Sequence, residues 1–142
     1  MINMNIYAAR LLKEWQQHGK VIISVDYDST ISYWPSIENK SDIERTIKLL
    51  KLAFNTGAYI VIFTCSHVDR YEEIQKHCDE LQLPINAINK NPLEMPYGNH
   101  GKIYYNINLC DRSGLREALD ILEVAMYSYL GSKQNKNIGD VA

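Results

Sequence analysis

The stretch VIISVDYDSTI, Val21 to Ile31, decides the fold of this chain. It begins with a nearly unbroken apolar run, which is typical of a strand buried on both faces of a sheet. Two carboxylates, Asp26 and Asp28, follow at the carboxyl end of that strand, and Thr30 adds a hydroxyl. Open α/β sheets bind ligands just beyond the carboxyl ends of their strands. A lone Asp-x-Asp turn usually only closes a loop, but the apolar strand before it and the Thr and Ile after it make this pattern more specific.

The length and composition fit one globular domain, which we place at residues 1–130, followed by a polar tail at 131–142. The chain is 46% hydrophobic and 23% charged, with three cysteines that lack CxxC spacing. No apolar stretch approaches the roughly 20 residues that span a bilayer, and the sequence shows no signal-peptide pattern. We therefore expect no membrane partner and a cytoplasmic location. The net charge of -2 without a basic cluster argues against an extended nucleic-acid partner.

Helices and strands are predicted to alternate along the chain. The predicted helices cover about 5–18, 42–55, 68–82 and 113–130, and the predicted strands cover 20–26, 58–64, 84–89 and 102–110. Gly19 is a natural stop for the first helix, and Ser41 to Glu44 form a capping box for the second. This alternation predicts an α/β fold with three layers, a mainly parallel Rossmann-like sheet and right-handed crossovers. The alternating residues of the last strand favour an edge position.

Polar side chains end three of the predicted strands. Asp26, Asp28 and Thr30 follow the first strand, Thr64 closes AYIVIFT, and Asp111 follows INLC. In this order they resemble motifs of the haloacid dehalogenase (HAD) superfamily. The string KIYYNINLCDR, followed by a small residue and Gly-Leu, is similar to the ending of small bacterial and phage HAD-type phosphatases. The resemblance extends from residue 20 to about residue 125.

The resemblance implies a HAD fold and a Mg²⁺-dependent phosphomonoester hydrolase. Asp26 would attack the phosphorus and form an aspartyl-phosphate, which water then hydrolyses. Asp28 would protonate the leaving oxygen and afterwards activate the water. Only residues 29–63 separate Asp28 from Thr64, and a helix uses much of that segment. The expected cap is therefore minimal (C0-type), and the site is open or covered by a second subunit of a homo-oligomer.

The expected Mg²⁺ ligands are Asp26, the carbonyl of Asp28 and Asp111. Many relatives carry two adjacent acids where this chain has Cys110 and Asp111, and a neutral thiol is a poor Mg²⁺ ligand. This departure supports an alternative function. The protein would then be a catalytically weak HAD-fold protein that binds or sequesters a phosphorylated or nucleotide ligand.

The resemblance also implies that Thr64 and a lysine hold the phosphoryl oxygens, with Lys102 as the better placed lysine and Lys90 in reserve. Further candidates for substrate contact are Thr30, Tyr33, Trp34, Cys65, Ser66 and Arg112. Aromatic side chains after the Asp turn could stack on a nucleotide base, or equally pack the loop onto its own domain or a second subunit. Cys65 is expected to be a small buried thiol, and Arg112 is expected either to bind phosphate or to pair with Glu117 or Asp120.

Three other classes of protein fit the sequence less well. A receiver domain uses a similar Asp, Thr and Lys set, but its phosphorylated Asp follows the third strand instead of the first. The chain has no G-x-G-x-x-G or Walker loop, which argues against dinucleotide and P-loop chemistry.

Overall fold

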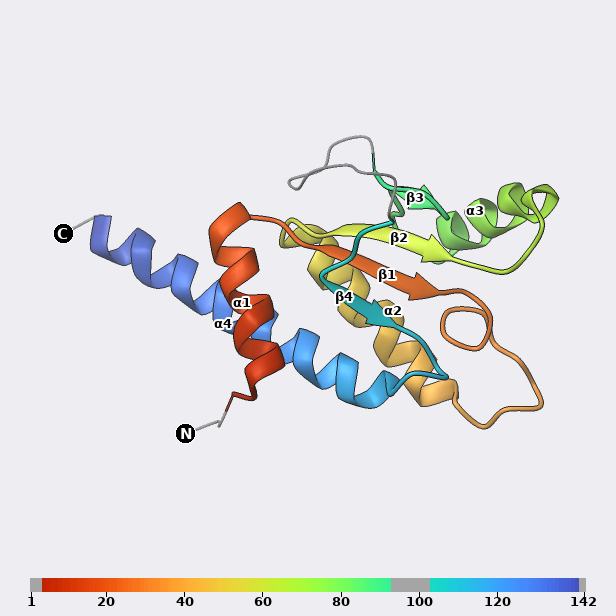
Figure 1. Ribbon diagram of the computed structural model, residues 1–142, viewed down its shortest axis with the longest axis horizontal. Helices are drawn as coiled ribbons and strands as arrows, with labels where there is room; N and C mark the ends of the chain where they lie inside the picture. The colour runs from red at the N-terminus through yellow and green to blue at the C-terminus, as the bar shows by residue number, and fades with distance from the viewer. Residues whose placement is uncertain (1–3, 93–102, 141–142) are drawn as a thin grey trace.

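The computed structural model describes residues 4–92 and 103–140, with side chains as far as residue 134. Its elements in chain order are α1 (Ile6–His18), β1 (Ile22–Asp26), α2 (Lys40–Asn55), β2 (Tyr59–Phe63), a 3₁₀ turn η1 (Val68–Arg70), α3 (Tyr71–Glu80), β3 (Ala87–Ile88), β4 (Ile107–Leu109) and α4 (Leu115–Asp140). The strands form one sheet in the order β3-β2-β1-β4, and all their pairings are parallel (Figure 1). The predicted α/β class with a parallel sheet is confirmed.

The strand β1 lies in the middle of the sheet. Five of its residues pair with β2 and three pair with β4. Ile22, Ile23 and Val25 are fully buried, as expected for a strand covered on both faces. The strand ends at Asp26, so the first carboxylate of the sequence pattern lies at the carboxyl edge of the sheet. The last strand, β4, occupies the predicted edge position.

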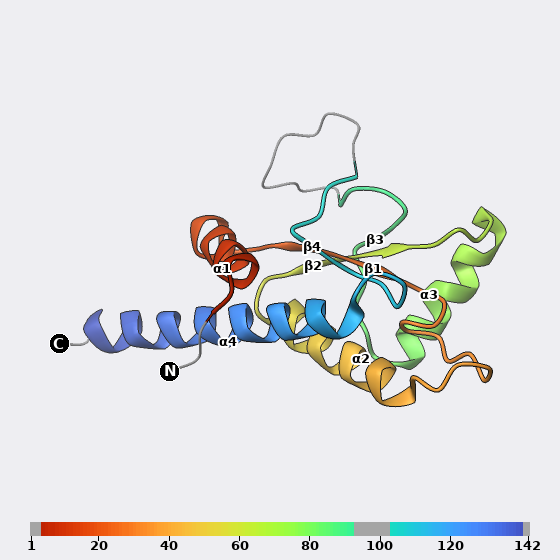
Figure 2. The same ribbon diagram turned by 60° about the horizontal axis from the view of Figure 1, so that its bottom comes forward.

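The described helices all contribute to the core on one face of the sheet. This core combines helical residues such as Trp15, Leu50, Ile74 and Leu119 with strand residues such as Ile23. Figure 2 shows α2 and α4 beneath the sheet. On the opposite face a smaller cluster contains strand residues and Tyr104, and no described helix contributes to it. Sheet and helices therefore form two layers among the described residues, and the predicted second helical layer is not found there.

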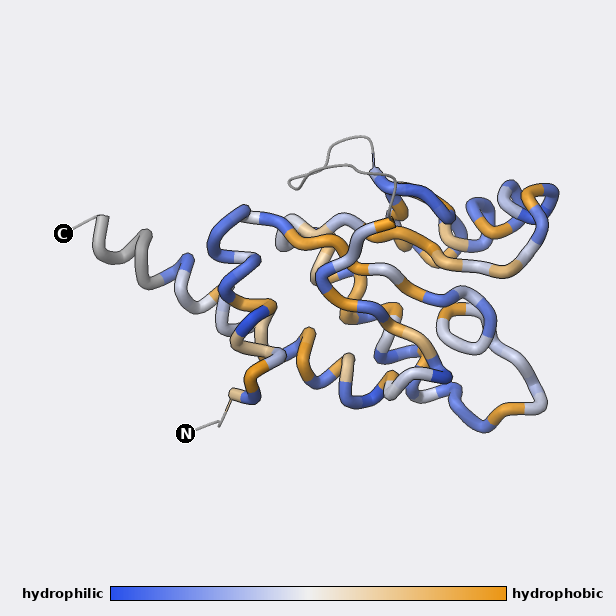
Figure 3. The backbone as a smooth tube through the Cα atoms, in the orientation of Figure 1, coloured by the Kyte–Doolittle hydropathy of each residue, from blue (hydrophilic) through white to orange (hydrophobic). Residues whose placement is uncertain are grey.

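The helix α1 is held by an aromatic anchor at its C-terminal end. Trp15 is fully buried, its ring stacks on Tyr129 at a centroid distance of 5.4 Å, and its Nε1–H donates to the carbonyl of Thr56. Gly19 then ends the helix with a left-handed φ of 71°, as predicted, and its N–H donates to the Trp15 carbonyl. Figure 3 shows β1 and β2 as largely apolar segments, whereas β4 and α1 alternate between polar and apolar residues.

The start of α2 differs from the prediction. The helix begins at Lys40 with Asn39 as its N-cap, so Ser41 lies inside the helix and the predicted capping box does not form. Asn39 makes no side-chain cap, and its Nδ2 amide group donates to the carbonyl of Ser29 in the preceding loop. The third predicted helix is also divided, since η1 comes before α3.

The strands β3 and β4 are shorter than predicted because asparagine side chains take over part of their pairing. Ile60 donates its N–H to the Asn86 side chain, and Asn86 donates its own N–H to the Ile60 carbonyl. Asn106 makes the same pair of bonds with Ile22 ahead of β4. These side chains satisfy backbone groups that would otherwise be buried without a partner.

The C-terminal helix is longer than predicted. The expectation was a helix to about residue 130 and a loose polar tail, but α4 continues to Asp140. Adding residues to an existing helix costs far less free energy than starting a new one, so weakly patterned residues can continue it. Among the described helices, none is both long and apolar enough to cross a membrane.

Replacing Trp15 should show how much the anchor stabilises the fold. Trp15→Ala removes a buried ring and should lower the free energy of unfolding by about 3–5 kcal/mol. Trp34→Ala is the matched control: Trp34 is 52% exposed, and such a surface change should stay within about 0.5 kcal/mol. Urea denaturation followed by circular dichroism measures both variants, and equal losses would contradict the assignment of Trp15 to the core.

Candidate active site

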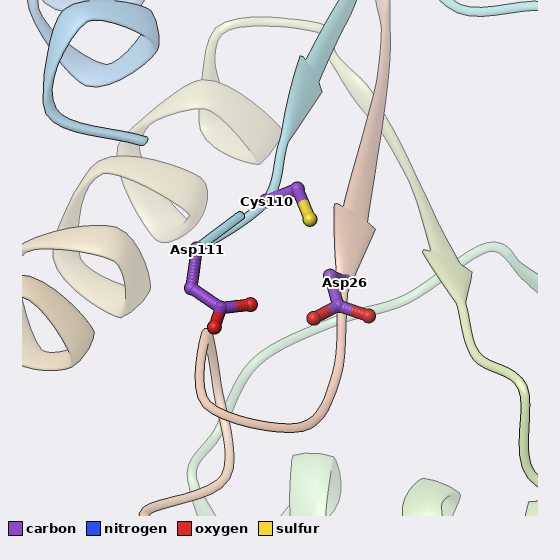
Figure 4. A group of neighbouring side chains, drawn as sticks. All are labelled: Asp26, Cys110 and Asp111. Carbon is purple, nitrogen blue, oxygen red and sulfur yellow. The ribbon is translucent and has the colours of Figure 1, made fainter. Parts of the chain in front are cut away.

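Two carboxylates and a thiol meet at the carboxyl ends of β1 and β4. Ligand atoms of Asp26, Cys110 and Asp111 all lie within 4.8 Å of one another, and we call these three residues the acidic cluster. Figure 4 shows Asp26 at the end of β1 and the other two residues on the segment that follows β4. The two strands are parallel neighbours, so residues far apart in the sequence meet at one edge of the sheet.

The hydroxyl of Thr30 links the two carboxylates. Thr30 is fully buried, and its Oγ1 lies 3.2 Å from Asp111 Oδ1 and 3.4 Å from Asp26 Oδ2. The same oxygen accepts the backbone N–H of Asp111 at 3.1 Å. A hydroxyl has only one proton, so it can donate to only one of the two carboxylates at a time. The predicted Thr30 thus belongs to the site, as a residue that positions both acids.

The turn after β1 is held by backbone hydrogen bonds and by Asn39. The carbonyl of Tyr27 accepts from the N–H groups of Ile31 and Ser32. Ser29 has a left-handed φ of 64°, and its carbonyl accepts from the Asn39 amide at 2.6 Å. Asn39 Oδ1 is buried and has no hydrogen-bond partner among the described residues. The sequence does not predict this role of Asn39, because the only local signal is an asparagine just ahead of a helix.

The pKa of Asp26 is raised from 3.8 to about 6. Burial is the largest cause, followed by the hydrogen bond with Asp111 and the charges of Asp111 and Asp28, while the Thr30 hydrogen bond lowers it. The charge of Asp28 therefore acts on the cluster, although Asp28 itself lies in the turn, where it forms an isolated bridge with Ser32. This concentration of negative charge favours a bound cation. Carboxylate oxygens suit Mg²⁺, whereas the Cys110 thiol does not.

Thr64 follows β2 and is held by Asn89. Thr64 N–H donates to Asn89 Oδ1 at 2.9 Å, and Asn89 Nδ2 donates to the Thr64 carbonyl at 2.7 Å. Asn89 Nδ2 also donates to the hydroxyl of Tyr71, and its backbone has a φ of 53°. Asparagine tolerates this left-handed conformation better than most residues. The sequence analysis treated Asn89 only as a strand end, although an asparagine directly after an apolar strand was the available signal.

A cavity of about 310 Å³ lies beside the acidic cluster. Its lining residues are Asp26, Phe63, Thr64, Cys65, Asn89 and Ile103. The structure thus brings the predicted Asp26 and Thr64 to one cavity. Cys65 also lines it but is exposed, so the expectation of a buried thiol is wrong.

The aromatic residues of the loop after β1 fall into two groups. Tyr27 is buried, and its hydroxyl hydrogen-bonds His77 Nδ1 at 2.6 Å, so it packs on its own domain. Tyr33 and Trp34 are 53% and 52% exposed. They are not among the described residues that line the cavity.

The remaining predicted contact residues are exposed, bond to other side chains or lie outside the described residues. Lys90 and Arg112 are exposed. The Ser66 hydroxyl accepts a hydrogen bond from Arg70, and the backbone N–H of Ser66 donates to Thr64 Oγ1. Asp120, one expected partner of Arg112, pairs with Arg45 at 2.7 Å. Lys102 lies outside the described residues.

Asp26→Asn should change how stability depends on pH. An acid whose pKa is higher in the folded protein than in the unfolded chain favours folding when it is protonated. In metal-free buffer, the stability of the unaltered protein should fall as the pH rises from 3.8 to about 6 and then level off. The variant cannot ionise there, so it should be the more stable protein above that range, and the difference should shrink in acid.

Urea denaturation across this pH range, with a chelator present, measures the effect of Asp26→Asn. Asp79→Asn, which removes an exposed carboxylate on α3, is the control for the loss of one negative charge and should not reproduce the effect of Asp26→Asn. A stability difference between Asp26→Asn and the unaltered protein that is the same at all pH values would contradict the raised pKa.

Known proteins supply no assignment of family or function to this chain. No protein-family model matches this chain, and comparisons with curated proteins and with solved structures find no match either. The function is therefore argued from the residues of the site.

Proposed function

We propose that the protein is a Mg²⁺-dependent phosphomonoester hydrolase of the HAD type, acting on a nucleotide or another small phosphate ester. The observation that carries the proposal is the meeting of Asp26, Thr30 and Asp111 at the carboxyl edge of the sheet, beside a cavity that Thr64 also lines. The order of these residues along the chain matches the HAD resemblance, and their placement in space is what the reaction needs.

Asp26 is the nucleophile of the proposed reaction. One Asp26 oxygen attacks the phosphorus, the ester oxygen leaves with a proton from Asp28, and an aspartyl-phosphate forms. Water then attacks that phosphorus, Asp28 takes up the proton of the water, and phosphate is released. A pKa of about 6 keeps Asp26 largely ionised at neutral pH, as a nucleophile must be.

The neighbouring groups position the reactants. Thr64 Oγ1 accepts from the Ser66 N–H and keeps its own proton to donate to a phosphoryl oxygen. Thr30 fixes the distance between the Asp26 and Asp111 carboxylates. Mg²⁺ bound by Asp26, Asp111 and the Asp28 carbonyl would supply the positive charge that offsets repulsion between nucleophile and phosphate.

The same proposal includes a HAD fold with a minimal cap. Residues 27–39 connect β1 to α2 without a helix or strand of their own apart from the single bridge in the Asp turn. This connection is too short to carry a cap domain. The site is then open or covered by a second copy of the chain.

Cys110 favours a second candidate function, in which the protein binds a phosphorylated or nucleotide ligand with little turnover. Its thiol occupies the third position of the acidic cluster, where a carboxylate would bind Mg²⁺ better. Intact nucleotide retained after incubation with Mg²⁺, and released by denaturation, would support this candidate over hydrolysis.

Asp26→Asn tests the proposed reaction. Loss of the nucleophile should lower kcat for an aryl phosphate in the presence of Mg²⁺ by about a thousandfold or more. Asp79→Asn should keep normal turnover. The rate of inorganic phosphate release measures the turnover of both variants. Comparable rates for Asp26→Asn and the unaltered protein would contradict the assignment of Asp26 as the nucleophile.

Cys110→Asp tests the metal part of the proposal. A third carboxylate in the cluster should tighten Mg²⁺ binding by about tenfold. Cys110→Ser has a similar size and no charge, so it should bind Mg²⁺ much as the unaltered protein does. Isothermal titration with Mg²⁺ measures the affinities directly, and identical affinities for the Asp and Ser variants would show that Cys110 does not face the cation.

A further inference from the structure

One wall of the cavity beside Asp26 is apolar. Asp26 and Phe63 are register partners on neighbouring strands, so their side chains lie on the same face of the sheet. Ile103 adds aliphatic surface to the cavity. The Phe63 ring is itself held edge-to-face by Tyr105, at a centroid distance of 6.0 Å and an interplanar angle of 74°. An aromatic side chain therefore lines the cavity beside the proposed nucleophile.

Among the described lining residues, the polar groups of Asn89 and Thr64 are largely engaged in hydrogen bonds. Asn89 Nδ2 donates to the Thr64 carbonyl and to the Tyr71 hydroxyl, and Asn89 Oδ1 accepts from the Thr64 N–H. Thr64 keeps one hydroxyl proton, which suits a single phosphoryl oxygen. Hydroxyl groups of a sugar placed against Phe63 and Ile103 would lose water without gaining partners, which weakens binding.

The size of the cavity leaves room for a ring beside the phosphate. Its volume of about 310 Å³ is at the small end of the range for ligand cavities. A phosphate alone leaves much of that space empty, whereas a phosphate with one attached ring uses it. Tyr33 and Trp34, the other aromatic side chains considered for substrate contact, are exposed and are not among the described lining residues.

From these observations we infer that the site is selective for aryl phosphomonoesters, whose ring packs against Phe63 and Ile103 while the phosphate lies between Asp26 and Thr64. This inference rests on the proposed function and narrows its substrate class to esters of aromatic alcohols. A nucleotide, whose phosphate is carried by a sugar, is then the less favoured substrate. The ligand ring makes a ring–ring contact with Phe63 and an apolar contact with Ile103, and the phosphate is the only strongly polar part of the ligand.

Phosphonates test the inference without turnover, because their carbon–phosphorus bond is not hydrolysed. In the presence of Mg²⁺, phenylphosphonate should bind about tenfold more tightly than methylphosphonate. Phe63→Leu keeps an apolar side chain but removes the ring, so it should reduce this preference to about threefold or less while methylphosphonate affinity stays the same. Trp34→Ala should leave the preference unchanged.

The outcomes separate this inference from the proposed function. Equal affinities for the two phosphonates, together with measurable phosphatase activity, overturn only the aryl selectivity. If Trp34→Ala loses the preference for phenylphosphonate and Phe63→Leu keeps it, the ligand ring packs on the loop after β1. That result overturns the inferred position of the ring against Phe63. Failure of both phosphonates to bind, with no turnover, overturns the proposed function as well.

Cys65 provides a readout of where the ring binds. Its thiol is exposed and lines the cavity, while Cys78 is buried and Cys110 half-buried. Saturating phenylphosphonate should slow alkylation of Cys65 about fivefold or more by steric exclusion, and a Cys65→Ser variant identifies the signal. Unchanged alkylation of Cys65 at saturation would contradict binding in this cavity.

The aryl group could belong to a protein side chain or to a free small ester. A peptide that carries the phosphonate analogue of phosphotyrosine distinguishes these two sources. Affinity equal to that of phenylphosphonate would identify a protein side chain as the source of the ring. Exclusion of the peptide would identify a free small ester, and both results retain the aryl class.

Discussion

Parallel pairing of β1 with both β2 and β4 is the constraint on which this structure depends. Parallel strands have their carboxyl ends at the same edge of the sheet, so whatever follows each strand meets there. In this chain those residues are Asp26, Thr64 and Asp111. The helices that connect and follow the strands pack on one face, and the core they form with the sheet holds the strand ends in place.

The site combines stabilising and destabilising interactions. Thr30 is buried and joins the segments after β1 and β4 through its single hydroxyl. Asp26 and Asp111, in contrast, are two acids held close together, and the raised pKa of Asp26 reflects that repulsion as well as burial. A protein core gains nothing from such a pair unless a proton or a cation neutralises it. An arrangement that costs stability at the ligand-binding edge of a sheet is typical of a functional site.

Asparagine side chains explain how such short outer strands can flank β1 and β2. β3 has two residues and β4 has three, too few to pair with the full length of their neighbours. Asn86 and Asn106 bond the backbone of the adjacent strand where the outer strands have not yet begun. Asn89 does the same beyond β2 and thereby fixes Thr64 at the cavity. Asparagine side chains that bond to the backbone of a neighbouring strand therefore both extend the sheet pairing and position Thr64 in the site.

The sequence by itself determined the elements with the strongest local signals. The apolar run before Asp26 predicted the buried central strand, the helical periodicity and Gly19 predicted α1, and alternation of strands and helices predicted the parallel α/β class. The polar strand ends identified Asp26, Thr30 and Asp111 as neighbours. These predictions succeeded because hydrophobic period, glycine conformation and strand direction are properties of short segments.

Tertiary structure decided the rest. The roles of Asn39 and Asn89 depend on hydrogen bonds to residues distant in the sequence, which no local pattern encodes. Only the packing separates buried Tyr27 from exposed Tyr33 and Trp34, although all three belong to one loop. The pKa of Asp26 likewise depends on burial and on Asp111, which the fold brings close. Distances and desolvation arise from three-dimensional packing, so they could be known only once the chain was folded.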